Sequence, residues 1–224
     1  MSRKSVLISY FFGDDMIPLG VSCANAFRDL GYDVLRFNSQ VESRWQPALL
    51  KPVNRLARGL GYRGRELGAR LPVARINFKK RMLERAARKF RPRWVFVIRA
   101  HEFVDAELVA RLKRDCGVEK VFAWRVDGPL DTPDLLEDAA VYDRYFCSHR
   151  HGYDPRRDRI DFLPVYGMDF SLYRNLHVGT YEHELVLVGG HNARREQLVA
   201  GLLELPLEIY GKWGRTRSKL SLTG

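Results

Sequence analysis

Apolar and polar residues alternate in short blocks from the N-terminus to Val165, and the blocks predict strands and helices in turn. Apolar, β-branched and aromatic runs of strand length lie between glycine, proline and acidic residues, which end regular structure. These runs predict strands over residues 6–11, 32–37, 94–98, 120–125, 142–148 and 160–165. Apolar residues at helical spacing predict helices over 18–30, 73–90, 103–114 and 135–140. The alternation predicts an α/β domain with a doubly wound parallel sheet.

The opening of the chain shows this pattern clearly. The strand at 6–11 leads into a loop with Gly13, Asp14 and Asp15, and the helix that follows stops at Gly31, just before the next strand. Such a unit forms a right-handed crossover, and we expect its two strands to be buried on both faces.

A basic segment, residues 51–93, interrupts the alternation. It carries fifteen Lys or Arg and two Glu, a balance of +13, whereas the rest of the chain sums to −2. Residues 51–70 hold few large apolar side chains and predict a mobile loop or short helices. The charge favours an anionic partner, which could be a phospholipid surface, a nucleic acid or a charged saccharide. A solvated pair of helices is the structural alternative.

The end of the chain predicts a second unit of strand, helix and strand. An apolar run at 185–188 enters a Gly-Gly turn, a helical pattern follows, and a second apolar run at 207–210 is closed by Gly211. Such a unit buries its apolar faces only when further strands and helices surround it. We therefore expect a first domain over 1–172, a linker over 173–183, and only the beginning of a second domain over 184–224.

Composition narrows the class of protein. A hydrophobic fraction of 46% and an aromatic fraction of 12% provide enough apolar surface for a packed core and exclude global disorder. No apolar run reaches the roughly 18 residues of a membrane-spanning helix, and the N-terminus is typical of a first strand rather than a signal peptide. Cys23, Cys116 and Cys147 are far apart and odd in number. They suit a reducing cytoplasm, and we expect them to be small buried apolar residues.

Ligands of open parallel sheets bind outside the carboxyl ends of the strands, so the loops there hold the candidate chemistry. His101 follows the strand at 94–98, and an imidazole that titrates near neutrality can take the proton of a hydroxyl nucleophile. Asp127 follows the strand at 120–125 and can accept a hydrogen bond or a proton from a sugar hydroxyl. The structural alternatives are a positioning histidine and an ordinary Asp-Gly turn. No metal site is predicted, because His149 and His151 lack further ligands at zinc spacing.

The Gly189-Gly190 turn is the best candidate phosphate site. Glycine lets the backbone approach an anion, the start of the following helix presents free N–H groups, and Arg194 and Arg195 add positive charge. Glycine is also common in strand-to-helix turns that bind nothing, so the position of the turn at the start of the second domain supports this interpretation.

Six short stretches, in order along the chain, resemble the two-domain GT-B glycosyltransferases and in particular the CgeB-like (spore-maturation-type) branch. They are residues 90–98, 124–129, 142–148, 163–169, 185–190 with the two arginines that follow, and 207–213. The sequence departs from the family at Gly128, which replaces the second acid of the usual Asp-Asp-Pro loop. The resemblance implies that a Rossmann-like N-terminal domain binds an acceptor, and that a C-terminal Rossmann-like domain binds a nucleotide-sugar.

The resemblance also implies roles for individual residues, and no cofactor beyond the nucleotide-sugar donor. The catalytic residues would be Asp127 and His101. The donor diphosphate would contact Gly189, Gly190, Arg194, Arg195 and Lys212. Within the acceptor-binding domain that the resemblance implies, the residues expected to contact the acceptor lie in or beside the loops at the strand ends: Gly13, Asp14, Arg99, Trp124, Arg150 and Tyr153. The acceptor could be a glycan, a lipid-linked glycan or a protein, and residues 51–93 could attract it or hold a cytoplasmic protein at the inner face of an anionic membrane.

Two other functions stay open. A non-catalytic α/β module could bind nucleic acid or an anionic membrane through the basic segment, although Tyr62, Phe78 and Phe90 are few aromatic residues for stacking bases. A dinucleotide-dependent oxidoreductase is disfavoured because the G-x-G-x-x-G pattern is missing. Most donor contacts of the family lie in later parts of the C-terminal domain, so turnover by this chain also stays open.

Overall fold

The computed structural model describes residues 4–13, 18–42, 50–61, 74–99, 103–126, 134–165, 184–202 and 204–211. The chain divides into two compact units, Met1–Tyr173 and Arg174–Gly224.

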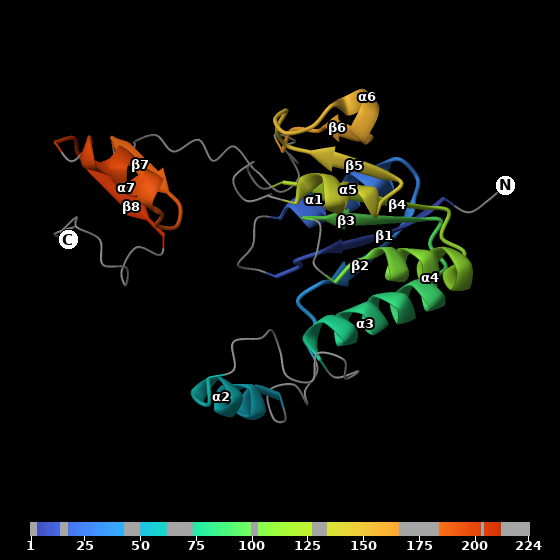
Figure 1. Cartoon of the computed structure of the whole chain (residues 1–224). Helices are drawn as coiled ribbons and strands as arrows, with labels where there is room; N and C mark the ends of the chain where they lie inside the picture. Colours follow the sequence, from blue (N-terminus) through green and yellow to red (C-terminus); the bar gives the residue numbers. More distant parts are fainter. Residues whose placement is uncertain are drawn as a thin grey trace. The chain divides into compact units, whose positions relative to one another are not determined.

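The first unit is built on a six-stranded sheet in which all strands are parallel (Figure 1). The strands are β1 (Ser5–Tyr10), β2 (Asp33–Asn38), β3 (Trp94–Ile98), β4 (Lys120–Arg125), β5 (Arg144–Cys147) and β6 (Ile160–Phe162). Their order is β2-β1-β3-β4-β5-β6, so the direction of winding reverses between β1 and β3. This reversal is the switch point at which open α/β sheets bind ligands.

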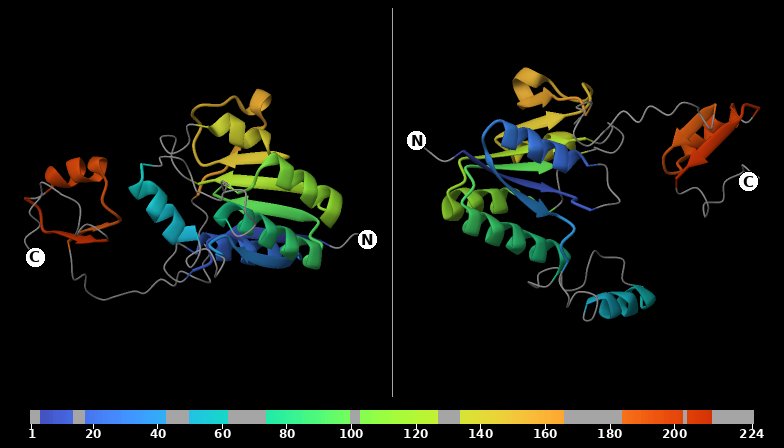
Figure 2. Two further views of the ribbon diagram at one scale, coloured as in Figure 1. Left: turned by 60° about the horizontal axis from the view of Figure 1, so that its bottom comes forward. Right: turned by 180° about the vertical axis from the view of Figure 1, so that it is seen from behind.

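Helices cover both faces of this sheet (Figure 2). Helix α1 (Leu19–Asp29) packs on one face, while α3 (Arg75–Phe90), α4 (Ala106–Cys116) and α5 (Leu135–Ala140) pack on the other. Two further helices, α2 (Lys51–Gly59) and α6 (Pro155–Asp158), have no buried residues. The predicted Rossmann-like α/β fold is confirmed.

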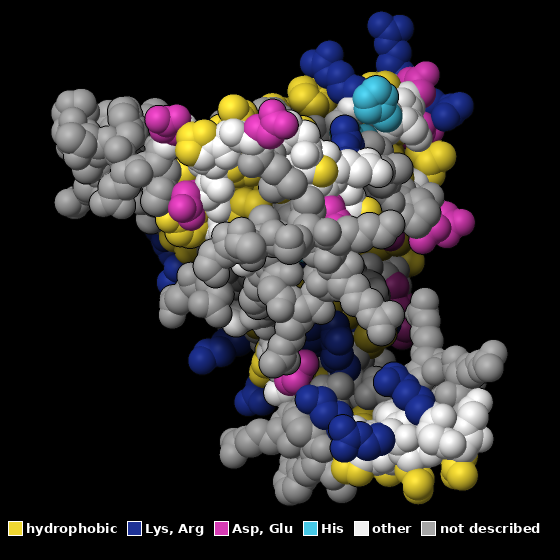
Figure 3. Space-filling model, turned by 90° about the vertical axis from the view of Figure 1, so that its left-hand side faces the viewer, with side chains coloured by type: hydrophobic (Ala, Val, Ile, Leu, Met, Phe, Trp, Pro, Cys, Tyr) yellow, Lys and Arg dark blue, Asp and Glu magenta, His cyan; other side chains and the backbone are white. Residues whose placement is uncertain are grey.

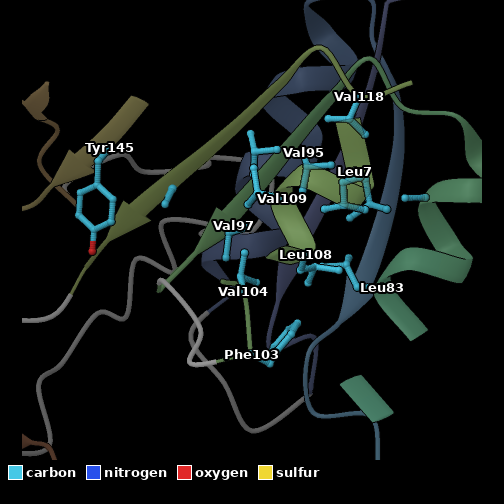
Figure 4. Close-up of a cluster of buried hydrophobic side chains, with 14 of the residues drawn as sticks. Leu7, Leu83, Val95, Val97, Phe103, Val104, Leu108, Val109, Val118 and Tyr145 are labelled. Carbon is cyan, nitrogen blue, oxygen red and sulfur yellow. The ribbon is translucent and has the colours of Figure 1, made fainter. Parts of the chain in front are cut away.

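The core consists of two clusters, one on each face of the sheet, because alternate strand residues point to opposite faces. In the larger cluster Leu7, Val95 and Val97 of the strands pack with Leu83 of α3 and Leu108 of α4 (Figure 4). The cluster under α1 is richer in aromatic side chains, which pack edge to face or stacked; its rings include Tyr10, Phe27, Tyr32, Trp94, Phe96, Phe122 and Trp124.

Asp143 joins the start of β5 to β4 through both its backbone and its side chain. Its N–H donates to the Val121 carbonyl at 2.9 Å, and its carboxylate accepts from the Val121 N–H at 2.8 Å and from Lys113 Nζ at 2.8 Å. Burial alone would raise the pKa of Asp143, but these hydrogen bonds outweigh burial and hold the pKa below its usual range. The carboxylate therefore extends the sheet ladder where β5 has not yet begun.

Strand β2 and the segment after β5 differ from the sequence expectations. Strand β2 is not buried on both faces: only Phe37 of its six residues is buried, because β2 lies at the sheet edge. Residues 51–59 form the regular helix α2, so the short-helix alternative holds there. Helix α6 was not predicted, although Asp154 gives a local signal, since its side chain accepts from the N–H groups of Arg156 and Arg157. Of the cysteines, Cys116 and Cys147 are buried and Cys23 is half-buried, and all three are free.

The second unit contains two parallel strands, β7 (Leu185–Val188) and β8 (Leu207–Tyr210), joined through α7 (Ala193–Ala200). Val199 of α7 is fully buried in this unit. The strands alternate between half-buried and exposed residues, and the exposed ones include Val186, Val188 and Tyr210. One face of this small sheet is therefore open to solvent, and it carries Glu208 beside these three residues. In the parts of both units that the structure describes, no helix has the length and apolarity needed to cross a membrane.

Candidate functional site

The loops at the carboxyl edge of the first sheet begin side by side, because backbone pairing continues past the strand ends. The Arg99 N–H donates to the Trp124 carbonyl at 2.7 Å, and the Ser148 N–H donates to the Arg125 carbonyl at 3.0 Å. The exits of β3, β4 and β5 are thus fixed relative to one another. A ligand at this edge would meet loop starts whose relative positions are fixed.

Among the described residues at this edge, Arg99 has an unusual backbone conformation. Its φ is +75°, in the left-handed region that costs an L-residue about 1–2 kcal/mol. The other described non-glycine residues with positive φ, Arg91 and Arg159, end helices α3 and α6, where this conformation is common. Arg99 instead follows a strand directly. Strain of this kind concentrates at functional sites, so the conformation of Arg99 marks the switch point as a candidate site.

The side chain of Arg99 lies over an aromatic ring. Its guanidinium is 5.4 Å from the centroid of Phe11, which follows β1, and the guanidinium of Arg36 on β2 lies 5.6 Å from the ring of Phe12. Arginines stacked on exposed or half-buried rings supply both positive charge and a flat apolar surface. The switch point can therefore contact a ligand that combines an anionic group with a ring, such as a glycan carrying phosphate or carboxylate.

Trp124, near the end of β4, is buried in the core. It is only 5% exposed, its ring stacks on Phe96, and its indole N–H donates to the Leu163 carbonyl at 3.0 Å. The side chain thus ties the chain after β6 to β4. Its geometry favours support of the edge from within the core over contact with a ligand.

Arg125, the next residue, was not singled out from the sequence as a site residue. Its Nη1 lies 3.4 Å from the carboxylate of Asp138 on α5, and its side chain is mostly buried. Burial raises the pKa of Asp138. The final position of Arg125 on a central strand was the signal that could have identified it.

The loop after β5 holds the candidates Arg150 and Tyr153. The Tyr153 hydroxyl donates to the His149 carbonyl at 2.8 Å, and burial raises the pKa of Tyr153. The Arg150 guanidinium lies 4.4 Å from the centroid of the Phe162 ring and is exposed. Tyr153 therefore closes its own loop, whereas Arg150 remains at the surface.

The remaining candidates of the first unit divide by whether the structure describes them. Gly13 is exposed after β1, and an added Cβ would have Gln40 Oε1 as its near neighbour at 3.9 Å. Asp14, His101 and Asp127 lie outside the described residues, as does Lys212 of the second unit. Among the residues that are described, no three His, Cys, Asp or Glu side chains are grouped as a metal ion requires.

In the second unit, the Gly189-Gly190 turn lies at the carboxyl end of β7, directly before α7. Asn192 caps the helix by accepting from the Arg195 N–H at 2.8 Å. Arg195 Nη1 donates to the Gly190 carbonyl at 2.6 Å. Arg195 therefore holds the shape of the turn, while Arg194 is exposed beside the start of the helix.

The three glycines around this turn differ in whether the fold leaves room for a side chain. A Cβ on Gly211, after β8, would overlap the Gly189 carbonyl oxygen, and a Cβ on Gly189 would lie 3.2 Å from Arg195 Nη1. A Cβ on Gly190 would meet nothing within 4 Å, and its φ is not in the positive range that favours glycine. The fold of the described residues thus explains Gly189 and Gly211 but gives no reason for glycine at Gly190.

His191 and Glu196 complete the turn, and sequence reasoning missed both. His191 Nε2 lies 3.0 Å from Glu196 Oε2, with both side chains mostly buried. The spacing of five residues across a helix start gave little signal in advance. The pair links the turn to the first turn of α7, beside the N–H groups at the start of the helix.

The sequence matches no protein-family model and no curated protein. Among solved structures, the chain is similar to MurG of Acinetobacter baumannii, with 14% identity and a TM-score of 0.48 over 92% of this chain and 60% of that one. It is also similar to UGT89C1 of Arabidopsis thaliana in complex with UDP-L-rhamnose, with 12% identity and a TM-score of 0.43 over 93% of this chain and 65% of that one. The chain thus spans less than two thirds of either structure's length. Likeness at this level assigns no activity to this chain.

Proposed function

We propose that this chain belongs to a GT-B-type glycosyltransferase of the CgeB-like branch, which passes a sugar from a nucleotide-sugar to an acceptor hydroxyl. In this proposal residues 1–172 bind the acceptor, residues 173–183 connect the domains, and residues 184–224 begin the domain that binds the donor. The exposed Val186, Val188 and Tyr210 of β7 and β8 support this organisation, because a βαβ unit inside a larger domain is covered on both faces.

Gly190 carries the donor side of the proposal. It lies where the N–H groups at the start of α7 and the Arg194 side chain can approach one anion. The absence of any neighbour within 4 Å of a Cβ there leaves room for a diphosphate against the backbone. Arg195 supports the same site by donating to the Gly190 carbonyl. Lys212 would add a further cation to the diphosphate.

The switch point of the first sheet is the proposed acceptor site. Arg99 and Phe11 offer a cation stacked on a ring, and Gly13 and Asp14 follow Phe11 in the sequence. Arg150 extends the positive surface beyond β5. Trp124 and Tyr153 contribute to this site by holding its loops in place. Such a surface favours a glycan or lipid-linked glycan that carries an anionic group.

The chemistry proposed for these sites is a displacement at the sugar's anomeric carbon. The acceptor oxygen forms a bond to this carbon, the bond to the diphosphate oxygen breaks, and the acceptor's proton passes to a base. Asp127 and His101 are the proposed bases, since each comes in the sequence within three residues of the carboxyl end of a central strand. The leaving diphosphate would be stabilised by the helix start and Arg194.

Calorimetric titration of the chain with UDP and with GDP tests the donor site. We expect one of the two to bind, and we expect Gly190→Ala to weaken binding at least tenfold without changing the melting temperature. Arg194→Gln removes a charge-assisted hydrogen bond worth about 1.5–3 kcal/mol, roughly tenfold or more in affinity. Arg156→Gln, on exposed α6, is the matched control. Absence of binding by the wild-type chain, or equal binding by Gly190→Ala, would exclude this donor site.

A further inference from the structure

Helix α2 carries an apolar stripe that the described structure leaves in water. Val53, Leu56 and Leu60, the last of which follows the helix directly, are 51%, 68% and 81% exposed. Their spacing of three and four residues places them along one side of the helix. Single exposed apolar residues are ordinary, but a stripe of three on a helix with no buried residue is not.

The opposite side of α2 is basic. At about 100° per residue, Lys51, Arg55 and Arg58 fall on the side away from the apolar stripe. All three are exposed, and the helix contains no acidic residue. In the space-filling view, blue and yellow side chains lie on different sides of the segment at the lower edge, where α2 lies in Figure 1 (Figure 3).

An anionic lipid surface satisfies both sides of such a helix at once. A nucleic acid or an acidic protein surface would neutralise the basic side and leave the apolar stripe in water. At a bilayer interface, the stripe enters the boundary between headgroups and acyl chains, while basic side chains reach the phosphates. The excess of positive charge over residues 51–93 strengthens attraction to anionic headgroups.

We propose that α2 lies in the plane of an anionic membrane, with Val53, Leu56 and Leu60 inserted below the headgroups. Its nine residues span about 14 Å, too short to cross a hydrocarbon core of about 30 Å. The inference develops the proposed membrane contact of the basic segment and does not depend on sugar transfer. It would place the first unit beside lipid-borne acceptors.

Flotation of the 224-residue chain with vesicles tests this inference. One set of vesicles is phosphatidylcholine alone, and the other contains 30% phosphatidylglycerol. We expect binding to the anionic set that weakens at high salt. Val53→Ser/Leu56→Ser/Leu60→Ser removes the stripe and should reduce binding at least a hundredfold, since each buried apolar side chain contributes roughly tenfold. Arg55→Gln/Arg58→Gln keeps the stripe and should reduce binding about 25-fold, about fivefold per charge.

Leu30→Ser is the matched control, because Leu30 is 66% exposed but stands alone after α1. It should bind vesicles as the wild type does. Circular dichroism and melting temperature should be unchanged in every variant, since all the substituted residues are exposed. The inference is overturned if the wild type does not bind anionic vesicles, or if the serine variant binds them equally. It is also overturned if the wild type is a dimer that the serine variant dissociates, since α2 would then contact a second copy. Vesicle binding without nucleotide binding would contradict the proposed donor site and leave this inference standing.

Discussion

Asp143→Ala should destabilise the first unit by about 2–3 kcal/mol. The substitution leaves the N–H of Val121, a residue with 0% exposure, without its side-chain acceptor, which costs about 1–3 kcal/mol. It also removes the contact with Lys113, whose side chain is 38% exposed, and a half-exposed pair of this kind contributes about 0.5 kcal/mol. For a unit of this size the loss lowers the melting temperature by about 5–10 °C.

Urea denaturation followed by tryptophan fluorescence measures this loss, because Trp94 and Trp124 lie on β3 and on β4. Asp161→Ala is the matched control: its carboxylate pairs with Arg144 at the surface and contributes only about 0.2–1 kcal/mol. Asp143→Asn keeps an acceptor for the Val121 N–H and should fall between the two. A loss below about 0.5 kcal/mol for Asp143→Ala, or one no larger than that of Asp161→Ala, would refute the assigned role of the Val121 hydrogen bond.

Two further predictions concern the turn of the second unit and the response of the first unit to pH. Gly211→Ala should abolish hydrogen-exchange protection of the Gly189 N–H, which donates to the Tyr210 carbonyl at 2.8 Å, because the added Cβ would overlap the neighbouring backbone. The control Gly190→Ala should leave this protection intact. Equal protection in the two variants would show that Gly211 is not required. Hydrogen bonds, with burial opposing them, hold the pKa of Asp105 and of Asp143 below their usual range. The contribution of these two carboxylates to the free energy of unfolding is therefore present above their unfolded pKa of about 3.9. It is lost as the pH falls through their pKa in the folded state. The melting temperature should be flat from about pH 7 to 5 and fall below about pH 4, and the difference between wild type and Asp143→Ala should shrink over that fall; a difference that is unchanged by acid would contradict this assignment.

Local patterns predicted most of the regular structure. Parallel strands buried on both faces appear as continuous apolar runs, so β1, β3 and β4 were found within a residue or so. The helix expected at 135–140 is α5 without change, because its apolar positions face one core cluster. Strand β2 was found at the right place, but its exposure depends on its place at the sheet edge, which no local pattern reveals.

Long-range contacts account for what the sequence did not reveal at the candidate site. Trp124 looked like a ligand contact because it lies beside a polar loop, but its indole partner is the carbonyl of Leu163, thirty-nine residues later. For residues 51–59 the sequence left a loop and a short helix open, because the segment has few large apolar residues. The backbone of Arg99 and the overlap between Gly211 and Gly189 arise from tertiary packing, which leaves no periodic signal.

The most direct test of the proposed function is the ¹⁵N chemical shift of each backbone amide during titration with the nucleoside diphosphate that binds. The proposal predicts that the largest shifts fall on Gly190, Ala193 and Arg194, at the turn and the start of α7. It also predicts that these shifts vanish in Gly190→Ala, while the amides of β1 and β3 do not move. Shifts confined to the basic segment, or an unchanged spectrum of the turn, would contradict a donor site in the second unit.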